Sequence, residues 1–142
     1  MSLLLDTCIL SEMVKKTPHV QVINWFNSQQ TAQLFISSIS IAEINKGLFK
    51  IQDKQPARYA ALCAWLQHLE TQFLHRILPV SDAVLQQWSA ISAQAELQGG
   101  KLAVMDSLIA ATALHHQLSL VTRNVADFNI TGLVLINPYL ND

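Results

Sequence analysis

Charged residues are scarce in this sequence: they make up 13% of its 142 residues, whereas soluble domains average about 25%. Hydrophobic residues account for 51%, so the composition excludes a disordered chain and predicts a folded one. A surface with so few charges is expected to be partly apolar, which favours a dimer or a permanent partner over a free monomer. The length predicts a single domain spanning residues 1–142.

Long apolar runs, cysteines and linkers are also few. No apolar run approaches the ~20 residues that a membrane-spanning helix needs, so we expect no membrane association. The two cysteines, Cys8 and Cys63, follow an N-terminus that has no basic secretory region. We therefore expect reduced thiols and a cytoplasmic protein. No stretch of Gly, Ser or Pro is long enough to be a linker, and the sequence has no internal repeat.

Positive and negative charges are nearly balanced in this sequence. Nine Lys and Arg residues stand against ten Asp and Glu residues, for a formal net charge of -1. The field of the whole protein therefore does not attract a polyanion such as nucleic acid. A polyanionic substrate would have to be held by a local basic patch or by bound metal ions.

Short apolar runs alternate with amphipathic segments along the chain. The apolar runs predict strands at 2–5, 33–37, 76–80, 119–122 and 133–136. Apolar residues at helical spacing predict helices at 18–28, 40–51, 57–73, 82–98 and 102–116. This alternation predicts an α/β fold with a mostly parallel sheet of four or five short strands, flanked by helices. Such sheets bind ligands at the carboxyl ends of their strands, where Asp6 and the segment after Thr122 fall.

The ten acidic residues fall into two groups. One group is expected on exposed helix faces, at a helix N-terminus or at the chain end, as solvated charges: Glu12, Asp53, Glu70, Asp82, Glu96 and Asp142. Members of the other group follow a strand or interrupt an apolar segment: Asp6, Glu43, Asp106 and Asp127. Asp106 lies between two apolar runs, where burying an unpaired carboxylate would be very costly.

Carboxylates that converge in one site need a counter-charge. They repel one another and raise one another's pKa, and this chain has few basic residues to neutralise them. A divalent cation is the simplest stabiliser. A cluster without Cys or His ligands favours Mg²⁺, or alternatively Mn²⁺, over zinc. Water bound to such a metal can attack a phosphodiester, and a second metal can stabilise the leaving oxygen.

Each of the four acids also has a purely structural interpretation. Glu43 comes three residues after Ser40 and fits the N3 position of a capping box. Asp6 fits a turn that ends a strand, Asp106 fits the first turn of a helix, and Asp127 fits an Asx turn. Taken singly, none of these acids indicates a catalytic site.

Four motifs follow one another along nearly the whole chain. They are Leu4-Leu5-Asp6-Thr7, Ser40-Ile41-Ala42-Glu43-Ile44 with Gly47, Asp106-Ser107-Leu108-Ile109-Ala110-Ala111-Thr112-Ala113, and Leu120-Val121-Thr122-Arg123-Asn124 with Asp127-Phe128. Together they make the sequence resemble the PIN-domain family, and most closely the VapC-type and FitB-like toxins of bacterial toxin-antitoxin modules. The resemblance implies a Mg²⁺-dependent endoribonuclease that hydrolyses RNA phosphodiester bonds. It also implies a parallel sheet, a homodimer and a small VapB-like antitoxin as partner.

The resemblance also assigns site residues. Asp6, Glu43 and Asp106 match the three acids of the family's pocket, and Asp6 and Asp106 are the expected direct metal ligands. Family members place Asp or Asn directly after Thr-Arg, here Asn124, and many have an acid three residues later, here Asp127. We expect both residues to line the site, with Asp127 supplying charge and Asn124 polar support.

Two further positions lie next to these acids. Thr122 is expected to form a hydrogen bond beside the metal position. Cys8 stands where the family usually has Asn after Asp-Thr, and a thiol is a poor hydrogen-bonding group. Cys8 is therefore either a packed and inert residue, the more common state of Cys, or a source of redox sensitivity. Because the acids are retained, the change does not predict inactivation.

A basic stripe is expected beside the acids. Glu43, Lys46 and Lys50 are spaced by three and four residues, so they share one helix face. With Arg123, and with Lys54 as a further candidate, the two lysines are expected to hold an RNA backbone. The alternative is an ordinary solvated helix face on which lysines support a glutamate.

Two other functional classes are weighed as alternatives. A noncatalytic PIN-like module that binds nucleic acid or has a regulatory role would keep the fold without the chemistry, and the retained acids argue against it. A receiver-like phosphoacceptor domain needs paired acids and a strand-tip Lys that the sequence lacks. The histidines are expected at the surface or an interface, and the tryptophans in the core or a dimer contact.

Overall fold

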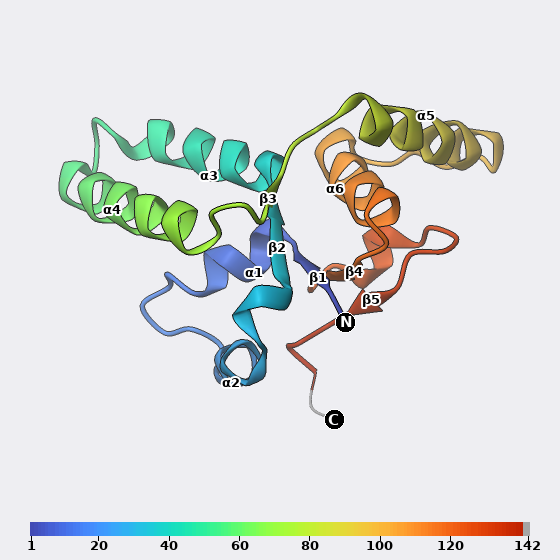
Figure 1. Cartoon of the computed structure of the whole chain (residues 1–142). Helices are drawn as coiled ribbons and strands as arrows, with labels where there is room; N and C mark the ends of the chain where they lie inside the picture. Colours follow the sequence, from blue (N-terminus) through green and yellow to red (C-terminus); the bar gives the residue numbers. More distant parts are fainter. Residues whose placement is uncertain (141–142) are drawn as a thin grey trace.

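Five short strands form one parallel sheet in the order β3-β2-β1-β4-β5 in the computed structural model, which describes residues 1–140 (Figure 1). The strands are β1 (Leu3–Leu5), β2 (Leu34–Ser37), β3 (Ile77–Leu78), β4 (Ser119–Val121) and β5 (Leu135–Ile136). The central strand is β1, whose Leu4 pairs with Phe35 of β2 and with Leu120 of β4. All four strand pairings are parallel, which confirms the predicted α/β fold.

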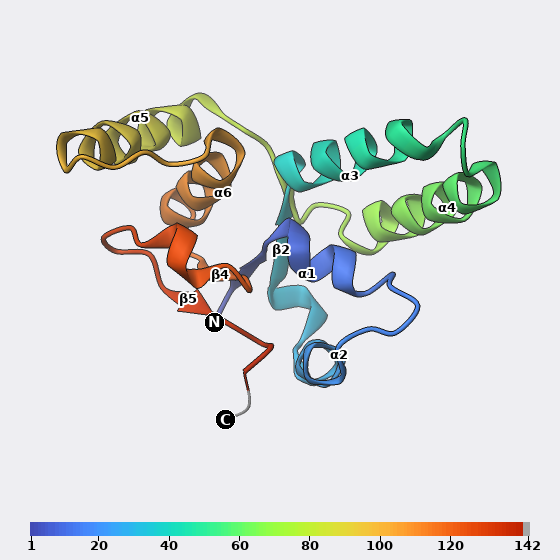
Figure 2. The ribbon, with the colours of Figure 1, turned by 180° about the vertical axis from the view of Figure 1, so that it is seen from behind.

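Helices cover both faces of this sheet. They are α1 (Thr7–Glu12), α2 (Val20–Ser28), α3 (Ser38–Ile51), α4 (Pro56–Gln72), α5 (Asp82–Leu97) and α6 (Val104–His115), with short 3-10 helices η1 (Thr31–Gln33) and η2 (Val125–Phe128). Figures 1 and 2 show α3 and α4 as a pair on one side of the sheet, and α5 and α6 as a pair on the other. None of the helices in residues 1–140 has the length and apolar character needed to cross a membrane.

The core consists of two hydrophobic clusters, one on each face of the sheet. Because successive side chains of a strand point to opposite faces, Leu3 and Leu5 pack in one cluster and Leu4 packs in the other. The first cluster takes residues from α1 to α4, and the second takes residues from α5 and α6. All three residues of β1 are buried, as a central strand of a parallel sheet requires. Asp6 directly follows this strand, so its carboxylate lies at the carboxyl end of the middle strand of the sheet.

Helix α1 is the one α-helix of residues 1–140 that was not predicted from the sequence. It is six residues long, too short to display a helical period. Asp6 caps it, because the Asp6 Oδ1 atom accepts the Thr7 N–H at 2.8 Å. Ile9 and Leu10 then bury completely against the sheet. The first strand therefore turns directly into a helix, and Asp6 lies at the junction.

The predicted capping box at Ser40 is wrong. Helix α3 begins two residues earlier, and its N-cap is Ser37, whose Oγ atom accepts the Ile39 N–H at 3.0 Å. Ser37 is the last residue of β2 and has the extended backbone that an N-cap needs. The helix therefore begins directly after Ser37, and Ser40 falls inside its first turn. Ser40 is buried inside the helix. Glu43 consequently has no capping function.

Glu12 is buried, which contradicts the expectation that it is a solvated charge. Its carboxylate accepts hydrogen bonds from Lys15 Nζ at 3.0 Å, the His19 N–H at 3.1 Å and the Tyr139 hydroxyl at 2.8 Å. Burial acts to raise the pKa of Glu12, but the hydrogen bonds from Tyr139, Lys15 and His19 outweigh it and lower the pKa to about 2. Glu12 therefore ties α1 to the C-terminal segment.

Most other expectations for side chains outside the site are confirmed. Asp53, Glu70, Asp82 and Glu96 are exposed, while Asp142 lies outside the described residues. Trp25 and Trp65 pack against the first cluster and Trp88 against the second, where its Nε1 donates to Ser107 Oγ at 2.9 Å.

Replacing Glu12 by Gln is expected to destabilise the fold by about 2 kcal/mol at neutral pH, since hydrogen bonds to a charged group are worth about 1.5 to 3 kcal/mol. The folded pKa lies below the ordinary value of 4.5, so this stabilisation is complete above that pH and is lost as the pH falls towards 2. Thermal unfolding of both proteins at pH 7 and pH 2.5 checks this, with the exposed Glu70→Gln as control. A difference in Tm that is equal at the two pH values would contradict the role of Glu12.

Candidate functional site

Four acidic side chains lie at the edge of the sheet where the strands end. Asp6 follows β1, and its N–H donates to Val121 O at the end of β4 at 2.9 Å. Glu43 lies on α3, Asp106 in the first turn of α6, and Asp127 in η2. Burial raises the pKa of Asp106, and the negative charges of the other three acids raise it further. Asp106 therefore lies within electrostatic reach of the other three carboxylates.

Asp6 is the most buried of these acids, with 4% of its surface exposed. Its Oδ1 atom accepts the Thr7 N–H, and its Oδ2 atom accepts the Thr122 hydroxyl at 2.7 Å. Thr122 is itself fully buried at the end of β4, and its Oγ1 atom accepts the Asn124 N–H at 3.1 Å. The predicted hydrogen bond from Thr122 is thus present, and it fixes the orientation of the Asp6 carboxylate.

Glu43 is held by a chain of two hydroxyl groups. The Thr7 hydroxyl donates to Glu43 Oε1 at 2.7 Å, and the oxygens of Thr7 and Ser40 are 2.8 Å apart. Because a hydroxyl has one proton and Thr7 gives its proton to Glu43, Ser40 must be the donor to Thr7. The sequence analysis missed both hydroxyl groups. The spacing of three residues between Ser40 and Glu43 was an available signal, whereas the role of Thr7 depends on the unpredicted α1.

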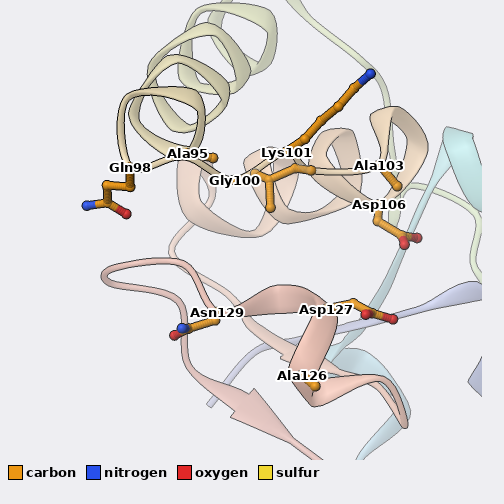
Figure 3. Close-up of a pocket in the computed structure, with 10 residues that line it drawn as sticks. Ala95, Gln98, Gly100, Lys101, Ala103, Asp106, Ala126, Asp127 and Asn129 are labelled. Atoms are coloured by element: carbon orange, nitrogen blue, oxygen red, sulfur yellow. The ribbon is translucent and has the colours of Figure 1, made fainter.

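The remaining polar residues form the rim of the site. Asp106 is half-buried, while Asn124 and Asp127 are exposed. In Figure 3 the carboxylates of Asp106 and Asp127 project toward the same side, away from the end of α5. Within residues 1–140 the structure contains one ion pair, between Lys15 and Glu12, so these acids have no basic partner there.

Any metal ion at this site would take only a few of its ligands from protein side chains. Among residues 1–140, no group of three or more His, Cys, Asp or Glu side chains could hold a metal ion by itself. Mg²⁺ is commonly held by one or two carboxylates and keeps several of its waters. Burial raises the pKa of Asp106 most, and the negative charges of Asp6, Glu43 and Asp127 add to this, so a divalent cation beside these acids would lower it.

Cys8 is half-buried behind Asp6. Its Sγ atom lies 3.6 Å from Asp6 Oδ2 and 3.8 Å from Thr122 Oγ1, and the residue packs against the first core cluster. Burial raises the pKa of the thiol, and the negative charge of Asp6 also acts to raise it. A protonated thiol in this position favours the interpretation of Cys8 as a packed residue over that of a reactive one.

The basic residues of the predicted stripe are exposed. Lys46 and Lys50 lie on α3, one and two turns beyond Glu43, and Lys54 follows the end of that helix. Arg123 lies between Thr122 and Asn124, and its guanidinium carbon is 4.8 Å from the centre of the Tyr139 ring. Contact of these residues with a substrate stays a prediction.

Comparison with known proteins finds relatives that align with nearly the whole chain. Toxin FitB of Neisseria gonorrhoeae is 30% identical over 139 residues, which cover 96% of this chain and 98% of that protein. VapC ribonuclease Y4jK of Sinorhizobium fredii is 31% identical over 141 residues, which cover 96% of this chain and 97% of that protein.

Among solved structures, the crystal structure of FitAcB from Neisseria gonorrhoeae is similar, with a TM-score of 0.90 and 29% identity, covering 96% of this chain and 98% of that one. Residues 3–130 match the family described as PIN domain, so the match spans β1 to η2 and includes all four acids of the site. The resemblance found in the sequence motifs is thereby confirmed, and the chain belongs to the PIN domain family.

Proposed function

We propose that this protein is a metal-dependent endoribonuclease and the toxin of a bacterial VapBC-type toxin-antitoxin system, acting on RNA in the cytoplasm. The observation that carries the proposal is the set of four acids that includes the buried Asp6 and has no basic partner in residues 1–140. The relatives named a toxin and a VapC ribonuclease align with nearly the whole chain. A noncatalytic PIN-like module is disfavoured, because it would have no need of unpaired acids.

Each residue of the site takes a separate role in this proposal. Asp6 and Asp106 would hold Mg²⁺, with Mn²⁺ as an alternative. The bound metal would supply an activated water and stabilise negative charge on the phosphodiester. The Thr122 hydroxyl donates to Asp6 Oδ2 and so fixes the orientation of the Asp6 carboxylate in the site.

Glu43 lies on α3 and is oriented by the Thr7 hydroxyl. Its carboxylate adds negative charge and accepts a proton or a hydrogen bond from water at the reacting phosphate. Asp127 and Asn124 lie on the exposed rim, where Asp127 adds charge and Asn124 offers an amide to substrate. We propose that both residues line the site.

An apolar groove of about 350 Å³ leads away from Glu43 and is a candidate docking place for the antitoxin. It is lined by residues of α1, of the turn that follows α1, of α3 and of α4: Thr7, Ser11, Val14, Lys15, Glu43, Ile44, Gly47, Leu48, Ile51, Arg58, Leu62 and Trp65. An apolar helix in this groove would bring its end to the acids. Exposed Phe49, Val104 and Met105 supply further apolar surface for the expected second copy of the chain.

Replacing Asp6 or Asp106 by Asn is expected to lower RNA cleavage by more than about 100-fold. Loss of a residue that only hydrogen-bonds to a metal ligand already lowers metal affinity or activity about 10- to 100-fold, and loss of a direct ligand is expected to cost more. The measurement is digestion of total cellular RNA with Mg²⁺ or with EDTA, with mapping of the new ends. The expected ends are a 5′-phosphate and a 3′-hydroxyl. Cyclic phosphate ends, or equal cleavage in EDTA, would contradict the proposed mechanism.

Mg²⁺ is expected to raise the Tm of the protein by several degrees, since a ligand at 100 times its Kd adds about 2.7 kcal/mol to the free energy of unfolding.

In EDTA, Asp106→Asn is expected to unfold at a higher temperature than the native chain. The folded pKa of Asp106 is raised, so its charge is destabilising at neutral pH and the neutral amide removes that cost. Thermal scans with the exposed Asp53→Asn as control check both effects. Equal gains from Mg²⁺ in Asp6→Asn and in the native chain would count against the metal site.

Lys46→Ala and Lys50→Ala are expected to raise KM for RNA and to weaken its dependence on salt. Each phosphate contact to a single strand contributes about 0.7 to the slope of log affinity against log salt. Cleavage measured at several salt concentrations gives this slope, and Lys16→Ala, an exposed lysine before α2, is the control. Unchanged KM and salt slope in both variants would reject the basic stripe.

A further inference from the structure

A second cavity opens on the other side of the acids from the Lys46 and Lys50 stripe. Its volume is about 540 Å³, and it lies between the end of α5, the start of α6 and η2 (Figure 3). The lining residues are Ala95, Gln98, Gly100, Lys101, Leu102, Ala103, Asp106, Ala126, Asp127 and Asn129. Two of the site acids, Asp106 and Asp127, are therefore part of its wall. A substrate held at these acids would be adjacent to the cavity.

The wall of the cavity has two chemically different parts. At the end away from the acids are the side-chain amides of Gln98 and Asn129, both exposed and therefore accessible to a ligand. The lining also includes three small apolar side chains, Ala95 on the side of Gln98 and Ala103 and Ala126 on the side of the acids. Small side chains leave room for a flat ring, and amides offer a donor and an acceptor to the edge of that ring.

The backbone that carries Gln98 and Asn129 is fixed by contacts on either side of each residue. Helix α5 ends in a Schellman motif, in which the Gly100 N–H donates to Ala95 O at 2.9 Å and the Gly99 N–H donates to Glu96 O at 3.0 Å. Gly99 has a φ of 83°, which favours glycine, and Gln98 is the C-cap directly before it. Asn129 directly follows Phe128, which is buried in the second core cluster. Neither amide therefore depends on a long loop for its position.

We propose that this cavity receives one base of the RNA next to the cleaved phosphate, and that Gln98 and Asn129 select that base by its hydrogen-bonding edge. The inference rests on the proposed ribonuclease function, because it assigns part of the same site. Single-stranded RNA is recognised mainly through bases that are splayed out and bound at their edges. Side-chain amides are well suited to this task, since Asn and Gln can form paired hydrogen bonds with a base.

The charges around the cavity favour a base over a phosphate as its occupant. Asp106 and Asp127 give the cavity wall a negative charge, which disfavours a second phosphate inside the cavity beyond the one at the metal. Lys101 is the one basic residue among those lining the cavity, and in Figure 3 its side chain extends away from the two carboxylates. A base is uncharged, and a volume of about 540 Å³ falls within the usual range of about 300 to 1,000 Å³ for small-molecule sites.

The first test measures sequence preference. An RNA oligonucleotide with a randomised segment is cleaved by the native chain, by Gln98→Ala and by Asn129→Ala, and the new ends are sequenced. The native chain is expected to prefer a base at one position beside the cut. Each variant is expected to reduce that preference at least about fivefold, the lower limit for a paired amide-base contact. Gln86→Ala, an exposed residue of α5 outside the cavity, is the control and is expected to keep the native preference.

The second test does not depend on cleavage. The four nucleoside 5′-monophosphates are titrated into the native chain, and the side-chain amide NMR signals of Gln98 and Asn129 are followed, each identified by its loss in the corresponding Ala variant. One base is expected to shift both signals more than the other three.

Uniform slowing on all sequences, or native preference in both variants with amide signals that do not move, would overturn the base site. If the amide signals respond but the native chain cleaves no RNA, the base site stands and the proposed nuclease function fails.

Discussion

The buried carboxylate of Asp6 is the constraint on which the rest of the site depends. It stands where the central strand ends, and it caps α1 through one oxygen while the Thr122 hydroxyl binds the other. These contacts compensate for burial of a charge, but they leave the negative charge itself in place. The three other acids add to that charge from α3, α6 and η2, and the effect is visible in the raised pKa of Asp106. A divalent cation is the simplest way to balance such a site.

The fold explains why residues so distant in sequence meet at this point. In a parallel sheet every strand ends at the same edge, so β1, β2 and β4 each deliver a polar segment there. The hydroxyl chain from Ser40 through Thr7 then connects α3 to α1 and holds Glu43. Away from the site, Glu12 and Tyr139 tie α1 to the C-terminal segment, and Tyr139 also lies under Arg123. The position of Arg123 beside the acids is thus linked to the same contacts that stabilise α1.

The sequence predicted the long elements well because their patterns are regular over many residues. The helices predicted over 57–73 and 82–98 match α4 (Pro56–Gln72) and α5 (Asp82–Leu97) to within one residue at each end. Two kinds of feature escaped it. Helix α1 is too short for a period, and the choice of Ser37 over Ser40 as cap depends on where β2 ends. Contacts between residues far apart also left no local signal: Glu12 and Tyr139 are 127 positions apart.

The four site acids were predictable because each belongs to one of the four motifs that resemble the PIN-domain family, but the cavity lined by Gln98 and Asn129 was not. Its walls come from three elements whose packing no local pattern specifies. The central claim is that Asp106 shares one site with Asp6, Glu43 and Asp127, and that a divalent cation balances their charge. Titration of the Asp106 carboxyl carbon by NMR tests it most directly. The account predicts a pKa above the ordinary 3.8 without metal and a lower pKa with Mg²⁺. An ordinary pKa that Mg²⁺ leaves unchanged would contradict it.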